Sequence, residues 1–236
     1  MTRLAATMAC DVRLQIRNGF YWAVAFILAV FLIILSQLPD VALAPILPPF
    51  ILGNLAMATF FFMAGLILLE KAEGTLEAQI VTPLTVLEYL ISKLATLTAL
   101  SVAESLIIIV IAHGLDFRLG SVLLGIVLAS LLYCLAGFAA VVRYDTINEL
   151  LFPSMVWVAA FSLPILQYAG VWTTPLMYLH PFQAPLVLLK GGFVPLAAWE
   201  WAYGIGYSVL WIAAGLAWSR SGFQRFVVAV AGGRSR

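Results

Sequence analysis

Charged residues are scarce in this chain, and their scarcity excludes an ordinary water-soluble fold. Only 10% of the 236 residues are charged, 64% are hydrophobic, and the mean hydropathy is +1.08, whereas soluble domains carry about 25% charged residues. A domain of this size could not hide so much apolar area from water, so the composition predicts a membrane protein. The net charge of +1 provides no general attraction to nucleic acid, and nucleic acid is not an expected partner.

Cysteine and lysine are also rare. Cys10 precedes the first long apolar run and Cys134 lies inside a later one, so the two predict neither a disulfide nor a metal site. The phosphate-binding pattern Gly-x-x-x-x-Gly-Lys-[Ser/Thr] is absent, and none of the three lysines follows a glycine. We therefore expect no cofactor in this chain and no ATPase activity of its own.

Long apolar runs, in contrast, are abundant. A helix needs about 20 apolar residues to cross the roughly 30 Å hydrocarbon core of a bilayer. We therefore expect an all-α membrane protein in which residues 1–236 form a single transmembrane domain. Six runs are long enough, at about residues 20–38, 48–69, 94–112, 120–142, 150–169 and 201–218.

Basic residues predict which ends of these spans face the cytoplasm, since Lys and Arg stay on that side. If the N-terminus is inside, ten of the twelve basic residues fall in inside segments, and only Arg118 and Lys190 fall outside. This bias predicts that both termini are cytoplasmic, together with the connection between the second and third spans.

Two segments are expected to lie along the membrane surface. Leu4, Met8, Val12 and Ile16 recur every four residues among three arginines, which predicts an interfacial helix before the first span. The fifth connection, residues 170–200, is rich in proline and aromatic residues and poor in charge. Its prolines exclude one continuous helix, so we expect a re-entrant or interfacial segment between the fifth and sixth spans.

The most polar stretch of the chain runs from Glu70 to Lys93 and holds four of the eleven carboxylates and two of the three lysines. Gly74 allows a sharp turn out of the second span, and Pro83 ends a short helix. Thr85-x-x-Glu88 has the spacing of a capping box, which begins a new helix. The pattern predicts helix, proline break and helix at the cytoplasmic surface. A well-capped loop with no further role is the plain alternative.

This stretch resembles the signature of ABC-2-type transporter permeases through three strings: Glu70-Lys-Ala-Glu-Gly-Thr-Leu-Glu-Ala, Thr82-Pro-Leu and Glu88-Tyr-Leu-Ile-Ser-Lys93. Two further strings are similar to the drug-exporting branch of that family, which includes the fluoroquinolone-export permeases. They are Asp11-Val-Arg-Leu-Gln-Ile-Arg-Asn-Gly-Phe-Tyr and Tyr178-Leu-His-Pro-Phe-Gln-Ala-Pro. The resemblance extends over most of the chain.

The resemblance implies a transport subunit in a bacterial cytoplasmic (inner) membrane. In the family, six spans form one half of a transmembrane domain, a second identical or related half faces it, and two separate ABC ATPase subunits bind ATP and Mg. The connection between the second and third spans is the coupling helix that contacts the ATPase. The residues that this match assigns to coupling are Glu70, Glu73, Gly74, Thr75, Leu76, Glu77 and Pro83.

The resemblance also implies a substrate pathway along the second and fifth spans. The candidates in these spans are Asn54, Thr59, Phe61, Trp157, Phe161 and Gln167. For any one of the aromatic residues, packing against lipid or another helix is the plain alternative.

Glu104 is a further pathway candidate, argued from its depth. It lies eleven residues beyond Lys93, which is about 16 Å along a helix and close to the bilayer centre. An intramembrane carboxyl usually faces the protein interior. It could contact a cationic substrate or relay protons, or it could be a protonated Glu bonded to Ser101 or to a neighbouring helix.

Three function classes follow from these observations. The first is the membrane subunit of an ATP-driven exporter of drug-like or lipid-like amphipathic molecules. The second is an ion-coupled secondary transporter that works through Glu104 and leaves the polar connection without a purpose. The third is a membrane-embedded enzyme, which the absence of Gly-x-Ser-x-Gly, His-Glu-x-x-His and paired intramembrane carboxylates disfavours.

Overall fold

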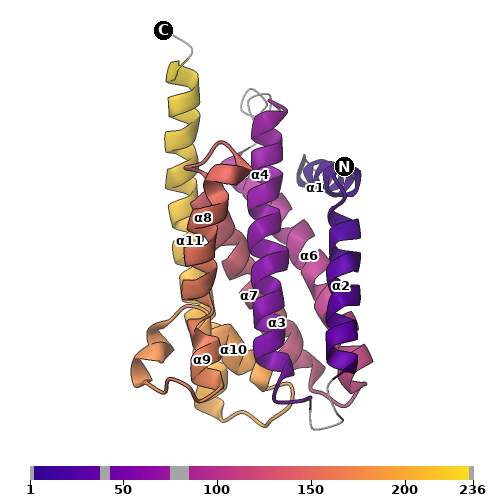
Figure 1. Ribbon diagram of the computed structural model, residues 1–236. Helices are drawn as coiled ribbons and strands as arrows, with labels where there is room; N and C mark the ends of the chain where they lie inside the picture. Colours follow the sequence, from indigo (N-terminus) through magenta and orange to yellow (C-terminus); the bar gives the residue numbers. More distant parts are fainter. Residues whose placement is uncertain (1–2, 38–42, 75–84, 234–236) are drawn as a thin grey trace.

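The computed structural model describes residues 3–37, 43–74 and 85–233, excepting the side chains of residues 220–233. Within these ranges the regular structure is entirely helical and contains no strand (Figure 1). The elements are α1 (Arg3–Arg17), α2 (Phe20–Ser36), α3 (Leu47–Leu55), η1 (Ala56–Phe61), α4 (Phe62–Ala72), α6 (Val86–His113), α7 (Leu119–Val141), α8 (Ile147–Phe161), α9 (Leu163–Tyr168), η2 (Pro175–Leu179), α10 (Gln183–Lys190) and α11 (Ala198–Gly233).

Helix α7 lies in the middle of the bundle and packs against α4, α6, α10 and α11. Glycines make two of these approaches close. A Cβ on Gly125 would lie 2.9 Å from the backbone nitrogen of Leu189 in α10, and one on Gly137 would lie 2.5 Å from the carbonyl oxygen of Phe60 in η1. Small residues of this kind bring helix backbones together in membranes, where packing replaces the hydrophobic effect as the driving force.

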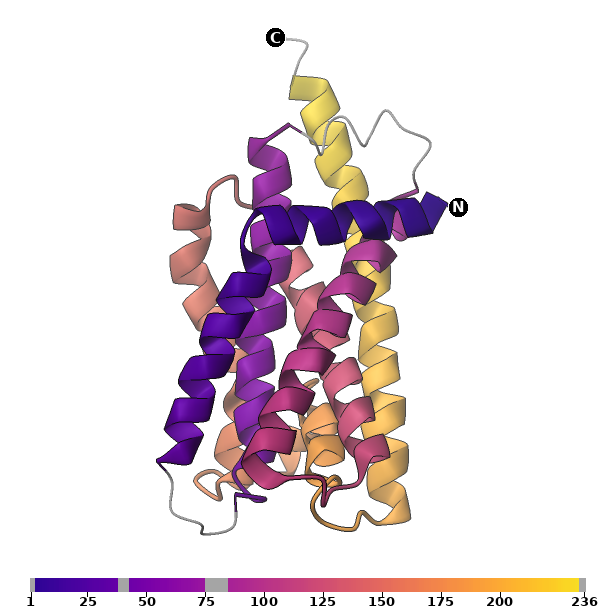
Figure 2. The same ribbon diagram turned by 90° about the vertical axis from the view of Figure 1, so that its right-hand side faces the viewer.

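Within the described ranges, four helical segments are long and apolar enough to cross a membrane: Leu47–Ala72, Val86–His113, Leu119–Val141 and Ile147–Tyr168. A fifth is added if α1 and α2, which meet at an angle of 62°, count as one bent span. The chain is thus a multi-pass membrane protein. Helices α2 and α11 run alongside these segments over much of the height of the bundle (Figure 2), and the count of six spans stays a prediction.

Helix α1 lies across one end of the bundle (Figure 2). The bend into α2 is made at Gly19, whose φ of +77° is a left-handed conformation that glycine adopts without strain. The face of α1 that is buried against the bundle is polar, since Asp11 and Gln15 are its buried residues. Ile16, from the apolar row that predicted an interfacial helix, is 57% exposed. The other three residues of that row are half-buried, so the residues that α1 buries most deeply are polar.

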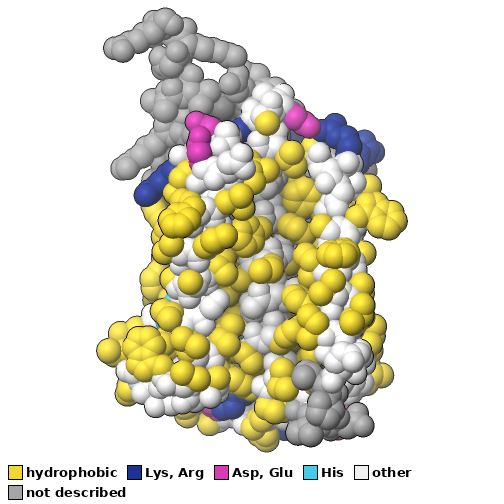
Figure 3. Space-filling model, in the orientation of Figure 1, with side chains coloured by type: hydrophobic (Ala, Val, Ile, Leu, Met, Phe, Trp, Pro, Cys, Tyr) yellow, Lys and Arg dark blue, Asp and Glu magenta, His cyan; other side chains and the backbone are white. Residues whose placement is uncertain are grey.

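On the face shown in Figure 3, charged side chains gather mainly at the end that carries α1, a smaller group lies at the opposite end, and the surface between them is largely hydrophobic. The ends of α4 and α7 and the beginnings of α6 and α8 meet at the α1 end (Figures 1 and 2). This grouping agrees with the charge bias from which we predicted the cytoplasmic side.

Two helices extend beyond the spans expected within them. Helix α6 begins at Val86, after its capping residue Thr85, as the capping box predicted. Helix α11 continues to Gly233, beyond the expected span at 201–218.

Two spans also contain breaks. The second span contains a π-helical turn, η1, between α3 and α4, and the fifth breaks at Ser162, just before Pro164. Pro153 stays inside α8 without ending it.

The fifth connection is discontinuous, as its prolines predicted. It forms the 3-10 turn η2 and the short helix α10, which packs between α7 and α11. All residues of α10 except Lys190 are buried. Pro185 is accommodated because it lies in the first turn of α10, where a missing N–H breaks no helical bond.

Candidate functional site

A buried ionic cluster joins three helices at the α1 end of the bundle. The Nζ atom of Lys93, in α6, lies 2.9 Å from Oδ1 of Asp11 in α1 and 2.5 Å from Oε1 of Glu70 in α4. The Lys93 side chain is fully buried, and the two carboxylates are 6% and 2% exposed. We call Asp11, Glu70 and Lys93 the three-helix cluster.

Each carboxylate oxygen of the three-helix cluster accepts a hydrogen bond. The second oxygen of Glu70 accepts one from the Tyr89 hydroxyl at 2.5 Å, and the second oxygen of Asp11 accepts one from the Ser92 hydroxyl. The Lys93 ammonium also lies 4.6 Å from the centre of the Tyr89 ring. Buried charges are tolerated only when they are paired and hydrogen-bonded in this way. The cluster therefore specifies one arrangement of α1, α4 and α6.

A second polar contact fixes α1 on α6. The Gln15 side-chain amide donates a hydrogen bond to the Thr96 hydroxyl at 3.0 Å, and both residues are buried. Gln15 lies one helical turn beyond Asp11, so the two contacts hold α1 along its length rather than at a point.

The last turn of α4 carries two further ionic contacts. Glu73 accepts two hydrogen bonds from the Arg17 guanidinium of α1, at 2.7 and 2.8 Å. Lys71 donates to the Tyr144 carbonyl at 2.6 Å and lies 3.4 Å from an oxygen of Asp145, in the turn between α7 and α8. The C-terminal end of α4 is thus bonded to α1, to α6 and to the α7–α8 turn.

The predicted boundaries of the polar connection are confirmed. Gly74 ends α4 with a φ of +67°, which favours glycine. The capping box is complete: the Thr85 hydroxyl accepts from the Glu88 N–H at 3.2 Å, and the Glu88 carboxylate accepts from the Thr85 N–H at 2.9 Å. Four coupling candidates lie outside the described residues: Thr75, Leu76, Glu77 and Pro83.

The remaining coupling candidates differ in accessibility. The Glu73 side chain is 36% exposed and can be reached from solvent. Glu70 is buried in the three-helix cluster, so its part in coupling would be to hold α4 against α6 rather than to contact a partner. The sequence predicted Glu70 as a coupling residue from the charged string in which it lies. It did not predict that Glu70 would form an ionic cluster with Lys93 and Asp11.

The pathway candidates do not form one site. Glu104 and Asn54 are buried on two helices that pack together, α6 and α3. No hydrogen bond of normal geometry joins them, and the described residues supply no other such bond to either side chain. The proposed bond from Glu104 to Ser101 is therefore not formed.

Two further candidates serve the structure of the second span. The Thr59 hydroxyl donates to the Leu55 carbonyl of its own helix at 2.6 Å, and Thr59 is fully buried. Phe61 packs edge-on against Phe60, with ring centres 5.3 Å apart. Both lie in the π-helical turn, where Thr59 satisfies a carbonyl through its side chain.

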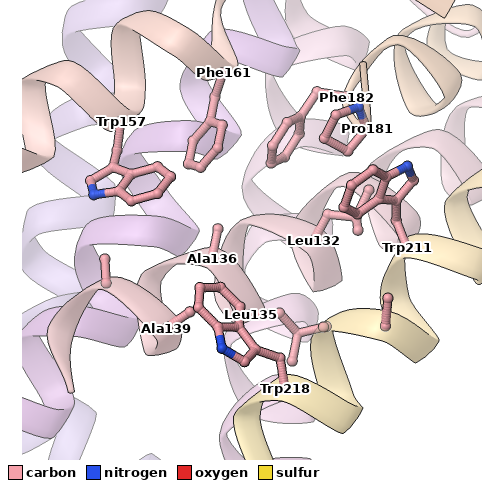
Figure 4. A pocket seen from close by; sticks show the side chains of 13 residues that line it. Leu132, Leu135, Ala136, Ala139, Trp157, Phe161, Pro181, Phe182, Trp211 and Trp218 are labelled. Carbon is pink, nitrogen blue, oxygen red and sulfur yellow. The ribbon is translucent and has the colours of Figure 1, made fainter. Parts of the chain in front are cut away.

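Trp157 and Phe161 line an apolar cavity of about 350 Å³ between α7, α8 and α11 (Figure 4). Figure 4 shows the Phe161 and Phe182 rings on one side of this space and Trp218 on the other, with Ala136 between them. The described residues that line the cavity are Leu132, Leu135, Ala136, Ala139, Ala140, Trp157, Phe161, Pro181, Phe182, Trp211, Ala214, Gly215 and Trp218. We call it the aromatic cavity.

His180 holds one wall of the aromatic cavity in place. Its Nε2 atom lies 3.1 Å from the Ala160 carbonyl of α8, and its Nδ1 atom accepts from the Phe182 N–H at 3.3 Å. Only a neutral imidazole with its proton on Nε2 can make both bonds. Burial lowers the pKa of His180, which favours that neutral form.

Gln167, the last candidate, lines a different and more polar pocket. This pocket, of about 410 Å³, lies at the opposite end of the bundle from α1 and includes Gln183, Lys190 and Glu200. The sequence argument therefore grouped residues that the fold separates. It also missed Phe182, Trp211 and Trp218, although Trp211 and Trp218, seven residues apart on one helix, share a face.

Comparison with known proteins identifies the family of this chain. The model of the Fluoroquinolones export permease protein family matches residues 2–231. Two proteins named as fluoroquinolones export permeases, from Mycobacterium tuberculosis strains CDC 1551 / Oshkosh and H37Rv, are each 34% identical to this chain over 232 residues. The match covers 97% of this chain and 98% of theirs. The chain belongs to the fluoroquinolones export permease protein family.

Proposed function

We propose that the chain is the membrane subunit of an ATP-binding-cassette exporter in a bacterial cytoplasmic membrane. It would cross the membrane six times with both termini inside and pair with a second permease half, identical or related. Two separate ABC ATPase subunits would bind ATP and Mg. The cargo would be a drug-like or lipid-like amphipathic molecule, and the names of the relatives make a fluoroquinolone the first cargo to test.

The observation that carries this proposal is the bracing of the connection between α4 and α6. Its two ends are held by the three-helix cluster, and the last turn of α4 is also tied to Arg17 and to the α7–α8 turn. A surface connection without a partner needs no such support. A segment that receives force from an ATPase does, because force is transmitted only through elements that move together.

The exposed flank of α8 fits a second permease half or lipid. Phe152, Met155 and Val156 are 77%, 64% and 64% exposed on this helix. Exposure of these apolar side chains to water would be unfavourable, so this surface suits an apolar partner or the acyl chains of the bilayer.

Co-purification tests the proposal. The chain is expressed with the ABC ATPase encoded beside it, extracted in detergent and captured by a tag on the permease. We expect the ATPase to be retained by the wild type and lost with the double substitution Gly74→Pro and Glu77→Arg. Asp116→Arg, a charge reversal in the exposed turn between α6 and α7, is the matched control and should retain it. Transport by the purified chain alone in vesicles, with no ATPase bound, would contradict the proposal.

A second candidate function, an ion-coupled transporter, is favoured by one observation, the buried Glu104 carboxyl without a hydrogen bond of normal geometry. Under this function, dissipating the proton gradient would abolish transport, and Glu104→Gln would have the same effect. Under the ABC proposal, Glu104→Gln is expected at most to reduce export of cationic substrates. Transport that depends on ATP and survives loss of the gradient would exclude the second candidate.

A further inference from the structure

We propose that the aromatic cavity is a binding site for an uncharged, flat aromatic molecule that enters from the membrane, and that a single chain holds the complete site. The inference rests on the proposed function and deepens it, because it assigns a chemical class and a location to the cargo. It differs from a pathway along the second and fifth spans, since the cavity lies between α7, α8 and α11.

The size of the cavity suits a small molecule. Sites for small ligands enclose about 300–1,000 Å³ and are lined mostly by hydrophobic and aromatic side chains. At about 350 Å³, the aromatic cavity is at the lower end of that range. It has room for a molecule of two or three fused or linked rings.

The lining favours rings over chains. The Phe161 and Phe182 ring centres are 4.7 Å apart, and those of Phe161 and Trp157 are 5.7 Å apart, both within the range of favourable aromatic contacts. Together with Trp211 and Trp218, these three aromatic side chains surround the cavity with ring faces and ring edges that a ligand can contact. A rigid planar ligand can contact these rings without losing internal freedom, whereas a flexible acyl chain loses rotamer entropy when it is held.

The lining excludes a formal charge. Among the side chains that the structure describes, none that lines the cavity belongs to Asp, Glu, Lys, Arg or His, and the only polar atoms that they contribute are indole nitrogens. An ionised group moved into such surroundings loses its hydration and gains no partner. The portion of the cargo that occupies the cavity must therefore be neutral.

The position of the cavity indicates entry from the bilayer. Trp157 lies ten residues from the start of α8, which is about 15 Å along the helix axis and near mid-membrane. Three cavity tryptophans, Trp157, Trp211 and Trp218, are 41%, 37% and 54% exposed on the flank of the bundle. Because this flank lies in the hydrocarbon region of a multi-pass protein, a molecule dissolved in lipid reaches the cavity without crossing water.

A neutral fluorophore and its charged analogue test the inference. N-phenyl-1-naphthylamine is uncharged, and 8-anilino-1-naphthalenesulfonate has the same ring system with an added sulfonate. The full-length chain is purified without an ATPase, and energy transfer from tryptophan to each probe is titrated. We expect saturable binding of the neutral probe at one site per chain and at least about tenfold weaker binding of the sulfonate, because of its desolvation.

Two substitutions fill the cavity from opposite walls. Ala136→Phe, on α7, and Ala214→Phe, on α11, are each expected to weaken binding of the neutral probe by at least about tenfold, since they occupy the space that it needs. Ala213→Phe is the matched control: Ala213 is the exposed neighbour of Ala214 and does not line the cavity. It should bind the probe as the wild type does. Size-exclusion elution verifies that each variant is folded.

Three results would overturn the inference: equal binding of both probes, undiminished binding in both filled variants, or displacement of the neutral probe by excess short-chain phospholipid. The last would identify an acyl chain as the preferred occupant. Failure here, with ATPase co-purification intact, would leave the exporter proposal standing. Probe binding as expected here, together with no ATPase retained in the co-purification, would leave the cavity inference standing and contradict the exporter proposal.

Discussion

Removal of the Lys93 ammonium should destabilise the protein strongly, because two buried carboxylates depend on it. Lys93→Met keeps a side chain of similar length but leaves Asp11 and Glu70 facing each other without a cation. Both carboxylates are at most 6% exposed, so water cannot replace the missing partner. Breaking a buried pair in this way typically destabilises a fold by about 3–5 kcal/mol. The free energy of unfolding, measured by titration with SDS in mixed micelles, should fall by that amount.

Two controls separate the loss of pairing from the loss of the side chain. Asp11→Asn, Glu70→Gln and Lys93→Met combined remove all three charges, and most of the lost stability should return, because a neutral replacement of a whole buried cluster is often close to neutral in free energy. Lys190→Met breaks the 3.6 Å pair with Glu200, in which the lysine is 40% exposed, and should change stability by less than about 1 kcal/mol. A loss below about 1 kcal/mol for Lys93→Met, or a triple variant as unstable as the single, would refute the reasoning.

Three further predictions test other parts of the fold. Gly137→Ala should destabilise the bundle by about 1–3 kcal/mol, because the new Cβ would lie 2.5 Å from a backbone oxygen of η1. Gly120→Ala, on the same helix but with open space around it, should leave stability unchanged. Thermal unfolding compares the two variants. Thr85→Ala should lower stability by about 1 kcal/mol through loss of the cap, and Thr85→Ser should restore it. Because the pKa of His180 is lowered, the stability that its neutral form contributes to the fold is complete above the ordinary histidine pKa of about 6.5. This stability is lost as the pH falls below that value. Melting temperature should therefore drop between about pH 7 and 5 in the wild type more than in His180→Gln.

Local signals in the sequence predicted local structure well. The capping box at Thr85 and Glu88 and the glycine turn at Gly74 depend on neighbours within four residues, so their spacing was sufficient evidence. The discontinuous fifth connection followed equally from the restricted geometry of proline.

Features that depend on distant residues could not be predicted in this way. Lys93 binds Asp11, which is 82 positions earlier in the chain, and no periodicity within one helix reports such a pair. The apolar row on α1 predicted a helix at the membrane surface, but nothing in the row indicated that Asp11 and Gln15 are the residues of α1 that become buried. The aromatic cavity likewise combines α7, α8, α11 and the segment around Phe182.

The π-helical turn has a consequence for chain length. A π turn contains one residue more than an α turn. An uninterrupted α-helix that directed the side chains at its two ends as Leu47–Ala72 does would therefore need one residue fewer. Deleting one residue within 56–61 would convert the turn to α-helix and leave Glu70 directed at Lys93. The second span therefore has one defined position at which a single residue can be deleted while Glu70 keeps its contact with Lys93.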